Sequence, residues 1–173
     1  MPQAVTHILI PIILVSIIRD FLVKNKRKFP LHYVLIAGLG GILPDLDYIT
    51  YLLNIQTETH RTLSHTIFVP IIFFILFLVF HSIKIKELGK HKLKLSIIFL
   101  MLSIGALTHI ILDAFVQGSI IPFYPFSSVS IGFNLINYLP EKLQRIASPS
   151  IDAIFLIIWI TYLELKHKIS DFI

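Results

Sequence analysis

Long apolar runs alternate with short polar connections along the whole chain. A helix needs about 20 mainly apolar residues to cross the hydrocarbon of a bilayer. Five runs reach or approach that length, at residues 4–23, 31–53, 62–83, 95–116 and 150–165. The third run is free of Asp, Glu, Lys and Arg. The pattern predicts an all-α polytopic membrane bundle of about five spans.

Small and ring-constrained residues interrupt the second run at Gly38, Gly40, Gly41 and Pro44. A broken helix at membrane depth persists only where it packs against protein or lines a wet cavity. We therefore expect a broken second span with a functional site near Pro44. The glycines themselves predict close packing between helices.

The only long connection covers residues 117–149 and contains four prolines. Its segment 120–126 (IIPFYPF) is too short and proline-rich to span, and it predicts either an aromatic interfacial loop or a wall over a pocket. A short amphipathic helix is expected near 140–147. Ser148 and Pro149 resemble an N-cap and first residue of the last span. We detect no internal repeat, and we expect a single integral membrane domain over 1–173.

Composition supports the membrane assignment and excludes other classes. Apolar residues make up 55% of the chain and charged residues 14%, whereas soluble domains are near 25% charged. This excludes a soluble globular enzyme, a disordered chain and a basic nucleic-acid-binding module. Because the chain has no cysteine, neither a disulfide framework nor a thiolate metal site is available.

The basic residues indicate an orientation. If the five runs alternate across the membrane, twelve of the fifteen Lys and Arg residues fall on one side. By the positive-inside rule that side is cytoplasmic. We therefore expect a multi-pass plasma-membrane protein with a cytoplasmic C-terminus and an extracytoplasmic N-terminus. The chain start lacks a basic signal-peptide region, so the first run is expected to be a retained span.

The remaining ionisable residues gather on the opposite, extracytoplasmic face. They are His7, Asp45, Asp47, His60, Arg61, His65, His109, Asp113 and Asp152. Ionisable groups at membrane depth are costly and are therefore functional candidates.

Helical spacing indicates which of the carboxylates can share an ion with a histidine. His109 and Asp113 are four residues apart, so both can reach one ion from the same helix face. Asp45 and Asp47 would point in nearly opposite directions in a continuous helix, unless Pro44 starts an irregular turn. One of these two carboxylates is then a better ligand candidate than both.

Residues 60–66 contain two histidines and an arginine, for which the spacing predicts different roles. His60 and His65 differ by about 140° around an ideal helix. His60 can reach the ion from the helix start, while His65 better suits a supporting position or a substrate contact. Arg61 is a clamp for an anionic group such as phosphate. A cysteine-free His and carboxylate set suits zinc, with manganese or iron as alternatives.

Three blocks together carry a family resemblance. They are 41–47 (GILPDLD), 60–66 (HRTLSHT) and 107–113 (LTHIILD), followed by Gly118 and the pair Pro122–Phe123 and preceded by Thr6–His7. Over residues 1–127 the chain resembles the YdjM-like family of membrane-bound metal-dependent hydrolases. Thr66 departs from the serine usual there. Residues 128–173 carry no part of the resemblance.

The order of these residues is also remotely similar to the first part of zinc-dependent phospholipases C. Those enzymes bind three zinc ions, and this chain lacks the later His pairs that complete their clusters. The resemblance implies one or two ions here, with Asp113 placed to bridge them and His7 on the second ion.

Structural explanations compete with each functional one. His7 could be an interfacial residue, and Asp45 could cap a turn. His109 and Asp113 could form a hydrogen bond that stabilises the bundle. Asp152 follows the predicted helix start closely, so the helix dipole explains it without a direct role in the site.

The expected function is a metal-dependent hydrolase that acts on a phosphoester, either a lipid or a lipid-linked or small phosphorylated molecule. The expected metal ligands are His7, Asp45, His60, His109 and Asp113. The expected catalytic residues are Asp47, Arg61 and His65. The expected partners are membrane lipids and not nucleic acid. An ion- or proton-coupled transporter and a catalytically silent metal-binding protein remain alternatives, although transport folds usually contain a repeat.

Overall fold

The computed structural model describes residues 4–47, 63–83, 85, 87–116 and 118–167. Within them the chain forms five α-helices and no β-strand. The helices are α1 (Ala4–Leu22), α2 (Leu31–Ile42), α4 (Phe68–Ser82), α5 (Leu95–Val116) and α6 (Glu141–His167). The prediction of an all-α fold is confirmed. α1, α5 and α6 are long and apolar enough to cross a membrane, while α2 and α4 are shorter apolar helices. The count of five spans stays a prediction.

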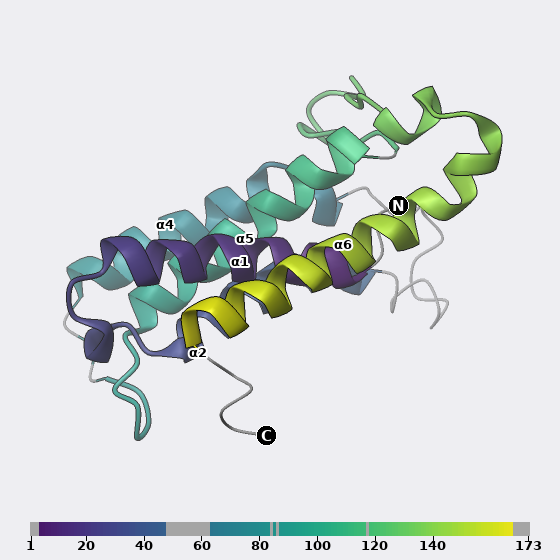
Figure 1. The fold of residues 1–173 in the computed structure, drawn as a ribbon. Coiled ribbons are helices and arrows are strands. Elements are labelled where there is room, and N and C mark those ends of the chain that lie inside the picture. Colours follow the sequence, from purple (N-terminus) through teal and green to yellow (C-terminus); the bar gives the residue numbers. More distant parts are fainter. Residues whose placement is uncertain (1–3, 48–62, 84, 86, 117, 168–173) are drawn as a thin grey trace.

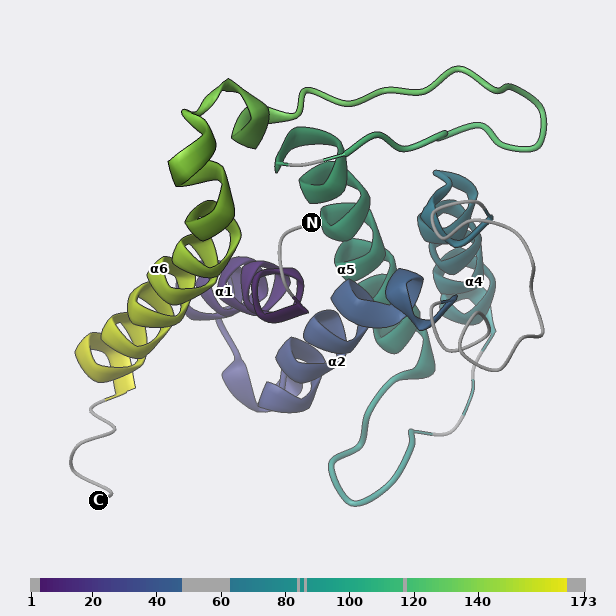
Figure 2. The same cartoon turned by 90° about the vertical axis from the view of Figure 1, so that its right-hand side faces the viewer.

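The helices run side by side along one direction (Figure 1). α5 packs against both α2 and α4, α1 packs against α2, and α6 lies along α1. Viewed from the side, the helices follow one another in the order α6, α1, α2, α5 and α4 (Figure 2). Large apolar side chains are exposed on every helix, as expected for surfaces that face lipid.

Glycines allow the central helices to approach one another closely, as their spacing predicts. A Cβ on Gly41 would lie 2.0 Å from the carbonyl oxygen of His7 in α1. A Cβ on Gly105 would lie 2.2 Å from the carbonyl oxygen of Ala37 in α2. Any larger residue would force these helices apart. The two glycines therefore fix how α1 and α5 meet α2.

The second apolar run is broken as predicted. α2 ends at Ile42, and the chain continues as a 3-10 turn, η2 (Leu43–Leu46), in which Pro44 is buried. Proline lacks the N–H that would continue an α-helical ladder. The tighter turn redirects the side chains that follow, and the part of the predicted span from 48 to 53 lies outside the described residues.

Two expectations about the last span are wrong. One continuous helix, α6, covers both the predicted short helix near 140–147 and the span 150–165. Ser148 and Pro149 lie inside this helix and not at its start. Pro149 is on an exposed face, where the backbone carbonyl that loses its N–H partner can contact water or a neighbouring group. Asp152 is about three turns into the helix, so a first-turn helix dipole does not explain it.

The connection from 118 to 140 folds back over the end of α5. Ile120 and Ile131 exchange two backbone hydrogen bonds of 2.8 and 2.9 Å. The N–H of Phe133 donates to the carbonyl of Ala114, the last turn of α5, at 2.7 Å. The side chains of Phe126 and Tyr138 are 84% and 83% exposed. The connection therefore presents exposed aromatic rings at this end of the bundle, and the choice between an interfacial loop and a wall over a pocket stays a prediction.

A buried carboxylate ties α6 to α1 at the other end. The Asp20 side chain is 1% exposed. It accepts a hydrogen bond from the Tyr162 hydroxyl at 2.6 Å and forms ion pairs with Lys26 and His167, each at 3.0 Å. This end also carries the basic connections between helices.

Candidate metal centre

Five side chains from four separate elements meet near the start of α1 and the end of α5. His7 comes from α1, Asp45 from η2, His65 from the 3-10 turn η3 (Leu63–His65), and His109 and Asp113 from α5. Four of these side chains are fully buried, and the Asp45 side chain is 22% exposed. The structure thus brings together all the predicted ligands that fall within its described residues.

The backbone of α2 sets the orientation of His109. Its Nδ1 donates to the carbonyl oxygen of Gly41 at 2.7 Å. This places the proton of a neutral imidazole on Nδ1 and leaves a lone pair on Nε2. Nε2 lies 3.7 Å from Oδ2 of Asp113, one helical turn away.

A serine and a carboxylate orient His65 in the same sense. The Ser64 hydroxyl donates to Oδ2 of Asp47 at 2.5 Å, so its oxygen is left to accept from Nδ1 of His65 at 2.9 Å. Oδ2 of Asp47 also lies 3.5 Å from this Nδ1. The Nε2 lone pair of His65 therefore faces the centre of the cluster. A second group that holds the outer nitrogen of an imidazole is the usual arrangement at metal sites.

The inward-facing atoms have the spacing of ligands around one ion. Nε2 of His65 lies 3.2 Å from Nε2 of His109. Oδ2 of Asp113 lies 3.5 and 3.7 Å from these two nitrogens, and so does Oδ1 of Asp45. Four ligands about 2.0–2.1 Å from a tetrahedral zinc ion would be roughly 3.3–3.4 Å apart. The donor set and its spacing fit a divalent ion.

His7 lies on the other side of Asp113. Its ring stacks on His109 with centroids 4.0 Å apart, and its Nε2 lies 3.4 Å from Oδ1 of Asp113. Among the described residues, neither ring nitrogen of this fully buried histidine has a hydrogen-bond partner. Together with Asp45 and His109 it makes a second group of atoms close enough to hold an ion. Asp113 directs Oδ1 toward His7 and Oδ2 toward His65 and His109.

The other residues predicted for the site are Asp47, His65, His60 and Arg61. Asp47 contacts the Ser64 hydroxyl and lies on the Nδ1 side of the His65 ring. His65 is placed among the inward-facing atoms, whereas helical spacing suggested a supporting position. His60 and Arg61 lie outside the described residues.

Asp152 reaches the site from α6. Its Oδ1 accepts a hydrogen bond from the N–H of Thr6 at 3.0 Å and another from the hydroxyl of Thr6. Both side chains are buried. Thr6 immediately precedes His7, so Asp152 fixes the segment of α1 that carries a candidate ligand.

Sequence reasoning did not predict three supporting contacts, which are made by the Gly41 carbonyl, the Ser64 hydroxyl and the Thr6–Asp152 pair. A role for Ser64 could have been predicted, because it directly precedes His65 in the 60–66 block of candidate functional residues. The other two contacts join residues far apart in sequence, and no local pattern predicts them.

The comparisons with known proteins give one match. The family model described as YdjM inner membrane protein matches residues 1–168. That match extends past residues 1–127, which carry the motif resemblance, and includes α6 with Asp152. A search of curated proteins and a search of solved structures find no match. Since the family model covers nearly the whole chain, this protein belongs to the YdjM inner membrane protein family.

Proposed function

We propose that this protein is a membrane-embedded, metal-dependent hydrolase that acts on a phosphoester carried by a lipid or a lipid-linked molecule. The observation that supports the metal most directly is the convergence of two imidazole lone pairs and two carboxylates on one buried space. Both Nδ1 atoms already donate elsewhere. A neutral imidazole carries one N–H proton, so these two rings have none left for their Nε2 atoms. A cation bound between the Nε2 atoms and the carboxylates would interact favourably with all four groups.

In this proposal the ion is held by Asp45, His65, His109 and Asp113, with His7 on a second ion if two bind. Zinc is the first choice for such ligands, with manganese or iron as alternatives. A divalent ion there would activate water and polarise a phosphoryl oxygen. Asp47 and Ser64 hold the ring of His65, so we assign them a positioning role.

Substrate would approach beside Asp45, the most exposed of the candidate ligands. The exposed aromatic rings of the 118–140 connection lie at the same end of the bundle, where they suit contact with lipid. A phosphate group is proposed because Arg61 follows His60 in the middle block, and a guanidinium matches phosphate oxygens. The remote resemblance to phospholipases C supports the same substrate class.

One observation favours a second candidate function. The Nε2 atoms of His65 and His109 are 3.2 Å apart, a distance at which a shared proton could pass between them. A proton-coupled transporter could use such a pair. Proton-dependent flux in sealed liposomes, without hydrolysis, would support transport over the hydrolase.

Removing the shared carboxylate should remove the metal. We expect wild-type protein purified in detergent and supplied with zinc or manganese to hold one or two ions. Asp113→Asn should weaken metal affinity by at least roughly 10–100-fold, because it removes a charged ligand. Elemental analysis after dialysis measures this. Asp20→Asn, at the buried carboxylate of the opposite end, is the control and should keep its metal. Equal metal content in Asp113→Asn and wild type would refute the assignment.

Arg61 should act on substrate and not on metal. Arg61→Ala is expected to retain wild-type metal content while turnover of bis(p-nitrophenyl) phosphate or a phospholipid falls by at least roughly tenfold, as expected when a charged hydrogen bond to phosphate is lost. Arg145→Ala, an exposed arginine of α6, is the matched control. Loss of metal or of folding in Arg61→Ala would instead indicate a structural ion pair.

The site is proposed to face the extracytoplasmic side. Because the chain has no cysteine, single cysteines can report sidedness. Ser128→Cys, in the connection at the site end, should react with a membrane-impermeant maleimide in intact cells. Lys90→Cys, at the basic end, should react only after permeabilisation. The reverse pattern would move the site and its substrates to the cytoplasmic side.

A further inference from the structure

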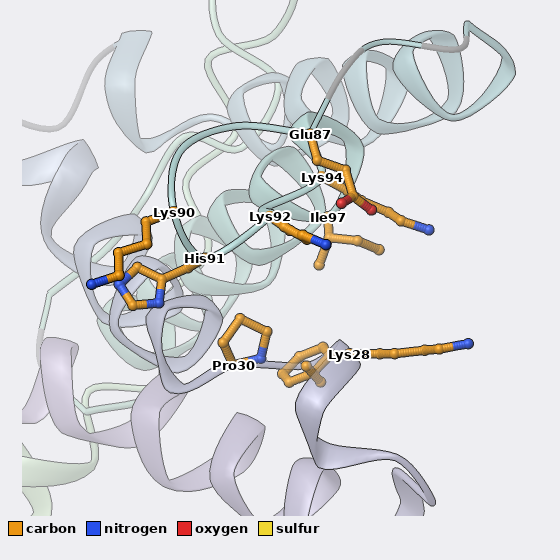
Figure 3. A pocket seen from close by; sticks show the side chains of 9 residues that line it. Lys28, Pro30, Glu87, Lys90, His91, Lys92, Lys94 and Ile97 are labelled. Atoms are coloured by element: carbon orange, nitrogen blue, oxygen red, sulfur yellow. The ribbon is translucent and has the colours of Figure 1, made fainter.

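The end of the bundle away from the metal centre contains a basic pocket of about 480 Å³. Four lysines and one glutamate line it, together with apolar side chains that include Phe29 and Ile97. Figure 3 shows that Lys28 comes from the connection between α1 and α2, whereas Lys92 and Lys94 come from the loop before α5. The side chains of these three lysines extend toward the same side of the pocket (Figure 3).

The loop that carries most of these lysines is held in place. The backbones of Leu88 and Leu93 exchange hydrogen bonds of 2.8 and 3.0 Å. The N–H of Lys94 donates to the hydroxyl of Tyr33 in α2 at 2.7 Å, and the Tyr33 side chain is almost fully buried. The lysines are therefore displayed from a folded turn that is attached to the bundle.

A ring contact fixes the tip of the same turn. The imidazole of His91 packs on that of His32 in α2, with centroids 4.1 Å apart. Lys92 has a φ of 52°, a left-handed conformation that costs free energy in a residue with a side chain. The turn thus keeps a strained lysine in place beside the pocket.

The lining of this pocket has more positive than negative charge, with four lysines and one glutamate. Among the described residues, no acidic side chain lies within ion-pairing distance of Lys28, Lys90, Lys92 or Lys94. Glu87 is the one acidic residue in the lining. By contrast, Lys26 nearby is paired with Asp20. An anionic ligand would balance the excess positive charge.

The position of the pocket indicates the chemical class of the anion that it would bind. Lys94 directly precedes α5, and Lys28 lies three residues before the start of α2. The lysines therefore lie where apolar helices end, at the level of lipid headgroups. Phe29 and Ile97 offer an apolar surface for the glycerol and the first part of an acyl chain. Basic pockets between helices at this level bind phosphorylated headgroups.

We propose that this pocket binds the phosphate headgroup of an acidic phospholipid. The site is separate from the metal centre and does not depend on the proposed hydrolase activity. About 15 residues of α5 separate Lys94 from His109, which is roughly 22 Å of helix. The bound lipid is a structural or regulatory ligand at this end and is not the substrate held at the other.

Binding of fluorescent phosphatidylglycerol to the detergent-purified protein, followed by anisotropy, tests the proposal. The double variant Lys92→Gln/Lys94→Gln should weaken binding by about tenfold or more, since each lysine near a headgroup contributes about 1 kcal/mol. Lys142→Gln/Arg145→Gln removes the same charge from exposed positions of α6 and should change binding less than about twofold. Unlabelled phosphatidylglycerol should displace the probe, and phosphatidylcholine should not. Thermal melting confirms that each variant is folded.

Three results would overturn the proposal. Equal weakening in the two double variants would show that diffuse charge, and not this pocket, attracts the lipid. Unchanged binding in folded Lys92→Gln/Lys94→Gln would exclude the pocket. Displacement of the probe by millimolar inorganic phosphate as effectively as by phosphatidylglycerol would assign the pocket to a soluble phosphate compound.

Discussion

The bundle concentrates lone pairs and negative charge in one buried space. The Nε2 atoms of His65 and His109 lie 3.2 Å apart, and the fully buried carboxylate of Asp113 faces both. Burial of a carboxylate is strongly unfavourable unless positive charge or hydrogen bonds compensate it. The Nδ1 atoms of both rings are directed outward, toward Ser64 and Gly41, so their Nε2 atoms face the two carboxylates. These buried His and Asp groups could hold a cation, which would compensate the negative charge of the carboxylates.

The rest of the fold supplies the precision that such a site needs. Gly41 brings the backbone of α2 against His7 and presents its carbonyl to His109. Gly105, one turn before His109, allows α5 to approach α2 with no side chain between them. Asp152 clamps the backbone beside His7 from α6. Helix packing and ligand orientation therefore depend on the same few contacts.

Local patterns predicted much of this architecture. The apolar runs gave the helical class, Pro44 and the glycines gave the break and the close packing, and one-turn spacing placed His109 beside Asp113. The inward position of His65 could not be predicted from ideal helix angles, because η3 is a 3-10 turn. The continuous α6 also differs from the sequence expectation, since Pro149 is tolerated on an exposed face. The hydrogen bond between Asp152 of α6 and Thr6 joins residues 146 positions apart, so no local sequence pattern could predict it.

We propose that the imidazoles and carboxylates at this end of the bundle hold a divalent ion. X-ray absorption at the metal edge of zinc-supplied protein tests it most directly. We expect imidazole scattering from at least two rings, with ligand distances of about 2.0–2.1 Å, and a weaker imidazole signal in His109→Ala. An ion surrounded by oxygen alone, or an unchanged spectrum in that variant, would show that these imidazoles do not bind the metal.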